Sequence, residues 1–465
     1  MSMLEILKVI SPVDGQPYVE RPLATATEIQ QALQNAGQAQ LKWRAVSIPE
    51  RAAFLTRAVD AFVAKTDPIA LEITRQMGRP IRFAPGEVRG FEERARYMIA
   101  IAEEALADLE VGKAPGFTRF MRRVPLGTVL VIAPWNYPYL TAINAVFPAL
   151  MAGNAVILKH SAQTPLCAER FAEVLGAAGL PEGVFQYLHM DHAATTGVIA
   201  SGQVDFVSFT GSVAAGHGVQ KAAAGGFAGV SLELGGKDPA YVRADADLDH
   251  AIENLADGAF FNSGQSCCAI ERIYVQREVY DRFVDGLVAF AKGYRLGDPT
   301  DPDTTLGPMV RPDAAEFARG QIEDAVARGA TALLDPRTFD ADQPGSAYMA
   351  PQILINVDHS MRVMVEETFA PVVGVMSVES DAEAVRLMND CRYGLSGAIW
   401  TSDEDAAVRI GNQVETGTWF MNRCDYLDPA LAWVGVKDSG RGCSLSRLGY
   451  ATLTRPKSFH LRTRL

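Results

Sequence analysis

Apolar residues recur at helical spacing through most of the first hundred residues. Residues 24–40, 49–65 and 92–109 each carry apolar positions three and four apart with charges between them. This spacing predicts amphipathic helices. From residue 127 the pattern changes to short β-branched runs that alternate with helical stretches. Such alternation predicts βαβ units and a parallel sheet that is buried on both faces.

The predicted strands fall into two series. The first covers residues 127–133, 155–159, 185–188, 206–210 and 230–234; the second covers 272–275, 332–334, 352–355, 372–378 and 394–400. We therefore predict an α/β protein with two doubly wound α/β domains. A cleft between two such domains is a common place for a ligand to bind.

Composition and charge narrow the class of protein. Of the 465 residues, 48% are hydrophobic and 21% are charged, which is typical of a folded globular chain. The net charge is −12 and no Lys/Arg-rich run occurs, so we expect no nucleic-acid partner. Apolar runs are too short to span a membrane, and residues 1–11 lack the pattern of a signal peptide. The six cysteines contain no Cys-x-x-Cys pair, so we expect reduced thiols, no metal site and a cytoplasmic location.

Two segments carry candidate catalytic side chains. Cys267 follows a glycine within the segment Phe-Phe-Asn-Ser-Gly-Gln-Ser-Cys-Cys-Ala, where a thiolate could act as a nucleophile. A buried, inert thiol is the alternative. Glu233 lies in Leu-Glu-Leu-Gly-Gly-Lys at the end of an apolar strand. Burial would suit it to general-base catalysis, while a structural glutamate paired with Lys237 is the alternative.

Two further segments carry candidate polar contacts. Asn136, in Pro-Trp-Asn-Tyr-Pro after a strand, could donate its side-chain N–H to an oxyanion, or it could be a turn residue. Residues 209–216 end a strand with Thr-Gly-Ser and open a helix. Free N–H groups at a helix N-terminus suit a pyrophosphate, although the usual G-x-G-x-x-G fingerprint is absent.

Taken together, these motifs resemble the aldehyde dehydrogenase superfamily over essentially the whole chain. The segments 232–237 and 264–267 look like the glutamate and cysteine signatures of that family. Glu233 and Cys267 are 34 residues apart, the spacing typical of its hydrolytic members. The other family motifs follow in order at residues 134–136, 159–165, 366–371 and 435–440.

The resemblance implies a reaction and three catalytic residues. Cys267 would attack an aldehyde to give a thiohemiacetal and then a thioester, with NAD or NADP as the cofactor. Asn136 and the backbone N–H of Cys267 would hold the oxyanion. Glu233 would activate the water that releases the carboxylic acid.

The resemblance also implies the cofactor contacts. Lys159 would reach the adenosine ribose, Ser212 the pyrophosphate, Glu367 the nicotinamide ribose and Phe369 the ring. Ala162 stands where NAD-preferring members often carry a glutamate, so we predict that NADP is accepted, with Lys159 and His160 meeting its 2′-phosphate. The remaining expected cofactor positions are Ile132, Trp135, Gly211 and Leu234.

Substrate contacts follow less directly. We expect Tyr137, Thr141, Asn144, Ser266, Tyr426 and Trp433 to line a funnel for an oxygenated or aromatic aldehyde. Arg423 would favour an acidic tail, as in a semialdehyde, unless it pairs with Asp425 at the surface.

Some features depart from the family or extend beyond its site. Ala145 and Ser444 replace a lysine and a glutamate that form a proton relay in many members, which puts the relay to Glu233 in doubt. The match begins near residue 10, so we expect the N-terminal strands of longer members to be absent.

Relatives form homodimers or homotetramers through a hairpin, expected here at residues 108–124 with 459–463 as its partner strand. The expected domains are NAD(P)-binding (1–107 and 125–236), catalytic (237–440) and oligomerisation (108–124 and 441–465).

Two other functions stay open at this point. A CoA-acylating aldehyde dehydrogenase would usually lack the glutamate, so Glu233 speaks against it. A catalytically silenced, cofactor-binding homologue is disfavoured by the intact Cys267, Glu233 and Asn136 but favoured by Ala145 and Ser444.

Overall fold

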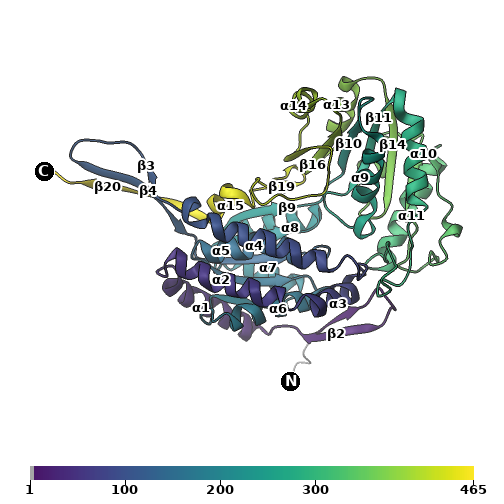
Figure 1. Ribbon diagram of the computed structural model, residues 1–465. Coiled ribbons are helices and arrows are strands. Elements are labelled where there is room, and N and C mark those ends of the chain that lie inside the picture. The colour runs from purple at the N-terminus through teal and green to yellow at the C-terminus, as the bar shows by residue number, and fades with distance from the viewer. Residues whose placement is uncertain (1–4, 465) are drawn as a thin grey trace.

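The computed structural model describes residues 5–464, which form two α/β units side by side and a projecting hairpin (Figure 1). The predicted α/β class with two parallel sheets is confirmed. Among the described residues, no helix is long and apolar enough to cross a membrane.

The first sheet has the strand order β19-β9-β8-β5-β6-β7. Strand β5 (Thr128–Ala133) pairs in parallel with β6 (Ala155–His160) and β8 (Phe206–Thr210), and every residue of β5 and β6 is buried. The outer strands are β7 (Phe185–Tyr187), β9 (Gly229–Glu233) and the antiparallel β19 (Gly440–Arg441). The connecting helices are α5 (Pro138–Met151), α6 (Pro165–Ala177), α7 (His192–Ala200) and α8 (Val213–Ala223).

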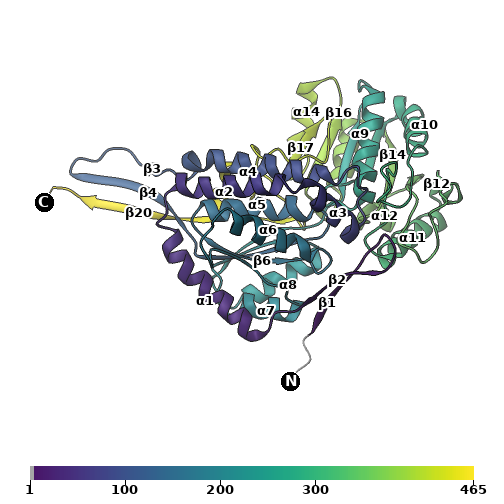
Figure 2. The same cartoon turned by 60° about the horizontal axis from the view of Figure 1, so that its bottom comes forward.

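N-terminal helices add to both faces of this sheet: the first packs on the face that α7 and α8 cover, and the next three pack over α5 and α6 on the opposite face (Figure 2). They are α1 (Ala26–Trp43), α2 (Ile48–Val63), α3 (Thr66–Met77) and α4 (Pro85–Ala105). Thr25 and Ser47 begin α1 and α2 with capping boxes, which satisfy the free N–H groups of the first turn. Helix α3 was not predicted. An N-terminal hairpin was also not predicted, since strands were expected to be absent there: β1 (Ile6–Ile10) pairs antiparallel with β2 (Pro17–Pro22).

The second sheet has the order β12-β13-β14-β11-β10-β16-β17 and is parallel except for its β12–β13 edge. Its strands are β10 (Asp238–Val242), β11 (Ile270–Gln276), β12 (Thr331–Ala332), β13 (Gln352–Ile355), β14 (Val372–Val378), β16 (Ser396–Trp400) and β17 (Thr418–Met421). Its helices are α9 (Leu248–Phe260), α10 (Tyr280–Ala291), α11 (Pro312–Ala327), α12 (Arg362–Val365), α13 (Asp381–Asn389) and α14 (Glu404–Gly411). The strands β10 and β17 and the helix α14 were not predicted.

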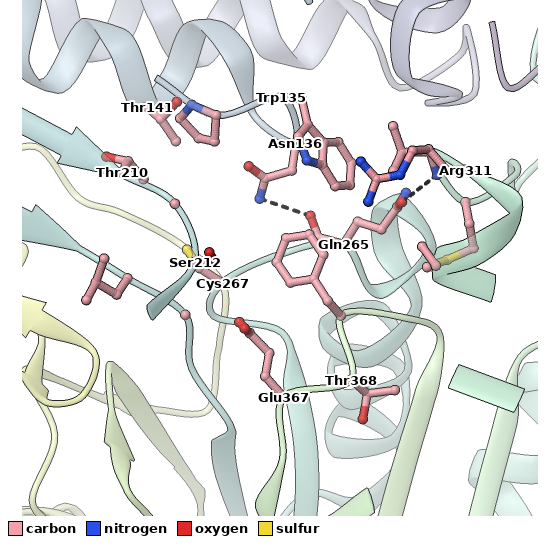
Figure 3. Close-up of a pocket in the computed structure, with 18 of the residues that line it drawn as sticks. Trp135, Asn136, Thr141, Thr210, Ser212, Gln265, Cys267, Arg311, Glu367 and Thr368 are labelled. Atoms are coloured by element: carbon pink, nitrogen blue, oxygen red, sulfur yellow. Dashed lines mark hydrogen bonds between the residues drawn. The ribbon is translucent and has the colours of Figure 1, made fainter. Parts of the chain in front are cut away.

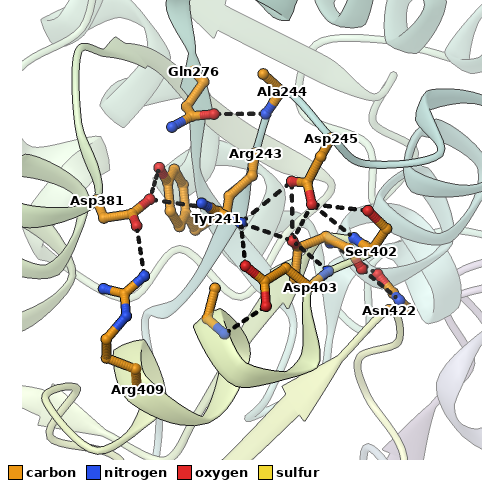
Figure 4. A network of polar contacts seen from close by, with 12 residues as sticks. Tyr241, Arg243, Ala244, Asp245, Gln276, Asp381, Ser402, Asp403, Arg409 and Asn422 are labelled. Atoms are coloured by element: carbon orange, nitrogen blue, oxygen red, sulfur yellow. Dashed lines mark hydrogen bonds and ion pairs between the residues drawn. The ribbon is translucent and has the colours of Figure 1, made fainter.

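A polar network holds α13 and α14 against the carboxyl end of β10, a central strand of the second sheet (Figure 4). Arg243, just after β10, contacts Asp381 on α13 and Asp403 at the start of α14. Asp381 also accepts a hydrogen bond from the Tyr241 hydroxyl and pairs with Arg409. These contacts stabilise the side of the second unit away from the first.

The hairpin predicted near residue 108 is present and projects from the body (Figures 1 and 2). Strand β4 (Phe117–Pro125) pairs with β3 (Leu109–Glu110) on one side and with β20 (Thr454–Arg462) on the other. Phe120 lies opposite Phe459, and their rings stack 4.5 Å apart. The partner strand therefore begins earlier than expected, since its pairing starts at Thr454.

Candidate active site

Two cavities meet at Cys267. The larger, about 420 Å³, lies at the carboxyl ends of the first sheet and reaches α11 (Figure 3). The smaller, about 280 Å³, is lined by residues of α4, α5 and the segment 425–433. Cys267, Glu233, Thr141 and Thr210 line both cavities. A group bound in either cavity can therefore reach the same thiol.

The loop before Cys267 has an unusual backbone. Asn262, Ser263 and Gly264 form the short helix η1 with Phe261 (Phe261–Gly264), and all three have positive φ, at 54°, 57° and 67°. Residues other than glycine rarely adopt this conformation, so neighbouring contacts must hold it. The Ser263 hydroxyl donates to the Gly307 carbonyl across 2.8 Å. Ordered strain of this kind is often found at functional sites.

The side chain of Asn136 lies against this loop. Its Nδ2 donates to the backbone carbonyl of Gln265 at 3.1 Å, and Gln265 Oε1 accepts from the N–H of Val310 at 2.7 Å (Figure 3). Asn136 is buried and lines the larger cavity beside Cys267. Its second amide hydrogen is therefore available to a ligand oxygen.

Sequence reasoning missed a buried ion pair behind Asn136. Arg79 pairs with Glu87 and donates from Nη2 to the Asn136 carbonyl at 2.6 Å and from Nε to Asn262 Oδ1 at 3.0 Å. Glu87 in turn accepts the N–H groups of Tyr139 and Leu140, in the first turn of α5. One pair thus joins the Asn136 turn, the start of α5 and the loop before Cys267.

Glu233 ends β9 at the junction of the two cavities. Burial raises the pKa of its carboxyl group, and hydrogen bonds from Ser444 (2.5 Å) and Thr210 (3.4 Å) act in the opposite direction. The alternative in which Lys237 pairs with Glu233 is wrong. Lys237 pairs with the buried Glu271 instead.

The Lys237–Glu271 pair holds the segment that carries Glu367 and Phe369. Glu271 accepts the N–H groups of Thr368 and Phe369, each at 2.9 Å, and Lys237 donates to the Thr368 hydroxyl at 2.9 Å. Burial, and next the neighbouring Glu271, raises the pKa of Glu367 to about 8. No local sequence pattern marks this pair, because its partners come from different strands.

The expected cofactor residues separate into two groups. Trp135, Gly211, Ser212, Leu234, Glu367 and Phe369 all line the larger cavity. The Phe369 ring meets the Trp135 ring edge-on at 5.7 Å. Ile132, Lys159 and Ala162 are not among the residues lining that cavity. Ile132 and Lys159 lie opposite each other at the carboxyl ends of β5 and β6, and Ala162 is exposed just beyond.

The expectation that His160 meets a phosphate is wrong. His160 is buried, its Nε2–H donates to the Pro138 carbonyl, and its Nδ1 accepts from Ser161 N and the Thr164 hydroxyl. Burial lowers its pKa to about 4, so the ring is neutral near pH 7. Lys159 is also buried, but no carboxylate lies within 4.0 Å of it among residues 5–464.

Most expected substrate residues do line the smaller cavity: Tyr137, Thr141, Asn144, Ser266 and Trp433. Tyr426 is not part of this lining; its hydroxyl donates to Glu93 at 2.7 Å. Arg423 stacks on the Tyr426 ring at 3.9 Å and forms no ion pair with Asp425. It is exposed, so its expected contact with an acidic tail is not supported. Arg94, Asp257 and Asp425 line this cavity without having been predicted.

Comparisons with known proteins give the family of this chain. Residues 2–459 match the sequence profile of the "Aldehyde dehydrogenase family". The NADP(+) succinate-semialdehyde dehydrogenase 1 of Mycobacterium tuberculosis is 34% identical over 445 residues, 95% of this chain and 97% of the relative. The corresponding enzyme of Deinococcus radiodurans is 35% identical over 448 residues, covering 96% and 93%. The Streptococcus pyogenes succinic semialdehyde dehydrogenase, solved with NADP+, gives a TM-score of 0.93 at 29% identity, covering 98% and 99%.

The chain therefore belongs to the aldehyde dehydrogenase family. The expected enzyme class, an aldehyde dehydrogenase that uses NAD or NADP, is confirmed.

Proposed function

We propose that this enzyme oxidises a small aldehyde to the free carboxylic acid through a thioester on Cys267. The observation that carries the proposal is the position of Cys267 at the junction of two cavities, beside Asn136 and Glu233. Catalysis of this kind needs a nucleophile, an oxyanion donor and a base within reach of one carbon atom. The coenzyme A alternative is disfavoured, because Glu233 lines the same junction and gives water a base.

The first step forms a covalent bond. The thiolate of Cys267 attacks the carbonyl carbon of an aldehyde in the smaller cavity, and the carbonyl oxygen gains the negative charge. The free amide hydrogen of Asn136 and the backbone N–H of Cys267 stabilise this oxyanion. Loss of one such donor typically lowers turnover about 10²- to 10³-fold.

The larger cavity fits NAD(P)+ at several points. The first turn of α8 begins at Ser212 on its wall, where helix N–H groups without intrahelical partners suit a pyrophosphate. The buried Lys159 ammonium suits a ribose hydroxyl, Glu367 suits the nicotinamide ribose, and Trp135 and Phe369 flank the ring. When bound, NAD(P)+ supplies the acceptor for the hydride of the substrate carbon.

Deacylation depends on Glu233. Its raised pKa brings its carboxylate closer to the strength of base that water activation needs near neutral pH. The activated water attacks the thioester carbon, the C–S bond breaks, and the acid leaves with the Cys267 thiolate restored. Ala145 and Ser444 remove the charged relay, and the Ser444 hydroxyl contacts Glu233 directly.

We also propose that NADP is accepted and preferred. Ala162 is exposed and uncharged, so no carboxylate repels a 2′-phosphate at this position. Lys159 is a nearby cation, and it has no carboxylate within 4.0 Å among residues 5–464. The names of the M. tuberculosis and D. radiodurans relatives, which specify NADP(+), support the same cofactor. Their names also favour a semialdehyde over an aromatic substrate.

The test is NAD(P)H formation with short, aromatic and acid-tailed aldehydes, each with NAD and with NADP. We expect Cys267→Ala to abolish turnover, and Cys391→Ala, a cysteine outside both cavities, to keep it. Turnover that survives in Cys267→Ala would contradict the mechanism. A wild-type enzyme that reacts with no aldehyde would favour the silenced homologue instead.

A further inference from the structure

The smaller cavity contains a buried arginine. Arg94 lies on the inward face of α4, only 8% exposed, and lines the cavity. Its Nη1 donates to the Leu140 carbonyl at 2.8 Å and to Asn144 Oδ1 at 3.3 Å. Within residues 5–464, its Nε and Nη2 donate no hydrogen bond and no carboxylate lies within 4.0 Å.

An unpaired guanidinium in such a place is costly. Burial lowers the pKa of Arg94, which reflects how poorly its surroundings solvate the charge. Buried charges in proteins are normally paired or satisfied by a ligand. The planar fork of arginine matches a carboxylate, which can accept two parallel hydrogen bonds from it.

A second donor in this cavity also lacks a partner. The hydroxyl of Tyr137 is buried and has no hydrogen-bond partner among the described residues. The Arg79 guanidinium stacks on the Tyr137 ring at 4.5 Å, which fixes the ring in place. The Tyr137 hydroxyl and two of the three guanidinium nitrogens of Arg94 are therefore donors in the wall of one cavity that have no acceptor among the described residues.

Two of the three acidic residues that line the cavity, Glu233 and Asp425, already accept hydrogen bonds from the protein. Glu233 accepts from Ser444 and Thr210. Asp425 accepts from the Ser266 hydroxyl at 3.2 Å and from the Cys268 thiol at 2.8 Å. Asp257 is exposed. A volume of about 280 Å³ admits only a short chain between these groups and Cys267.

We propose that Arg94, assisted by the Tyr137 hydroxyl, binds the carboxylate at the far end of a short ω-oxo acid whose aldehyde carbon reacts at Cys267. This inference rests on the proposed function and names its substrate class. Arg94 thereby replaces Arg423, the exposed arginine, as the residue that selects an acidic tail.

The test compares three four-carbon aldehydes: succinate semialdehyde, butanal and 4-aminobutanal. They carry an anionic, an apolar and a cationic end, and kcat/KM should be highest for the first. Arg94→Gln should lower kcat/KM for succinate semialdehyde about 10- to 100-fold, mainly through KM, because hydrogen bonds to a charged group are lost. Butanal should react as before. Tyr137→Phe should give a smaller loss of the same kind.

Two variants control for structural damage. Arg94→Lys keeps the charge without the fork and should recover part of the loss, while Arg423→Gln should change nothing. An equal loss for succinate semialdehyde and butanal in Arg94→Gln would overturn the proposal, since it would make Arg94 purely structural. A wild-type preference for 4-aminobutanal would also overturn it and assign specificity to Asp257 and Asp425.

A binding measurement separates this proposal from the proposed function. Calorimetry with succinate, the acid that succinate semialdehyde would yield, can be done on Cys267→Ala without any turnover. Binding that Arg94→Gln abolishes supports the tail site even if no aldehyde is oxidised. Absence of binding, or binding unchanged by Arg94→Gln, overturns it even if butanal is oxidised.

Discussion

Ser444 donates its hydroxyl hydrogen to Oε1 of Glu233 across 2.5 Å. By the resemblance to the family, Ser444 and Ala145 stand where many members are expected to carry the two charged residues of a proton relay. The structure shows that the replacement is not an empty position, because a neutral donor contacts the base itself. Glu233 thus keeps a polar neighbour without a second buried charge, which would be costly if unpaired.

This contact gives a prediction for the pH dependence of deacylation. A hydrogen bond to the ionised form lowers a carboxyl pKa, so Ser444→Ala should raise the already raised pKa of Glu233 further. A net hydrogen bond of about 0.5–1.5 kcal/mol corresponds to as much as about one pH unit. The acidic limb of kcat against pH should move upward by that amount, with turnover lowered at neutral pH.

Ser444→Thr is the matched control, because it retains the hydroxyl. Its dependence of kcat on pH should coincide with that of the wild type. A profile for Ser444→Ala that coincides with both would mean that deacylation does not limit kcat or that Ser444 leaves Glu233 unaffected. Rapid-quench measurement of the NAD(P)H burst distinguishes these two cases.

The three residues proposed as catalytic could be singled out from the sequence because each lies in a short contiguous motif. Cys267, Glu233 and Asn136 line the larger cavity as expected, and so do six of the nine cofactor positions. The helices and strands with clear periodicity were also predicted. Short elements such as β10 and β19 were not, since their pairing depends on distant strands.

Contacts between distant segments could not be predicted in this way. Arg94 sits on α4 among charged residues, and only the packing of α4 on α5 shows that it faces a cavity. Arg423 lies in a segment expected near the substrate, so the contact with an acidic tail was expected of Arg423 rather than of Arg94. His160 was assigned by its nearness to Lys159, yet successive residues on a strand face opposite sides. The Lys237–Glu271 pair joins β11 to the start of β10 and has no local signature.

The buried pair of Arg79 and Glu87 gives a stability prediction. Arg79→Met leaves the Glu87 carboxylate without its cation, so the free energy of unfolding should fall by about 3–5 kcal/mol. Urea unfolding measures this. The free energy of unfolding should fall less in the double variant Arg79→Met/Glu87→Leu than the sum of the falls in the two single variants, because the double variant leaves no buried charge unpaired. If the double variant lost as much free energy of unfolding as the two single variants added together, a direct interaction between Arg79 and Glu87 would be contradicted.

Arg79→Lys separates folding from catalysis at the same position. It keeps the charge beside Glu87, but one ammonium cannot reproduce the fork that contacts Asn136 and Asn262. We expect a folded enzyme in which kcat falls about 10-fold or more, because a small misplacement of an oxyanion donor is costly. Wild-type kcat in Arg79→Lys would show that the Asn136 turn is positioned without this contact.

Ala162 gives a prediction for cofactor choice. Ala162→Glu places a carboxylate beside the expected site of the adenosine ribose, where it repels a 2′-phosphate and accepts from ribose hydroxyls. The ratio of kcat/KM for NADP over NAD should fall at least about 10-fold by this repulsion. The position is exposed, so folding should be unaffected. Ala162→Gln, of equal length and neutral, is the control; an equal change in both variants would point to steric exclusion rather than charge.

Asp425 gives a pH-dependent stability. Burial raises its pKa to about 6, with hydrogen bonds from Cys268 and Ser266 acting in the opposite direction. The folded protein then binds a proton more tightly here than the unfolded chain, in which the carboxyl has its ordinary pKa of 3.8. The contribution of this group to stability is therefore greatest at acid pH and is lost as the pH rises from about 4 through 6.

Asp425→Asn tests this sign. Its amide oxygen can still accept from Ser266 and Cys268, but it does not ionise. Above pH 6 we expect the variant to be more stable than the wild type by about 1–3 kcal/mol, from the difference between the two pKa values. The gain should vanish near pH 4, where the wild-type carboxyl is protonated. Urea unfolding of both proteins across this range measures it, and a difference that does not change with pH would show that Asp425 acts on stability through packing rather than through its charge.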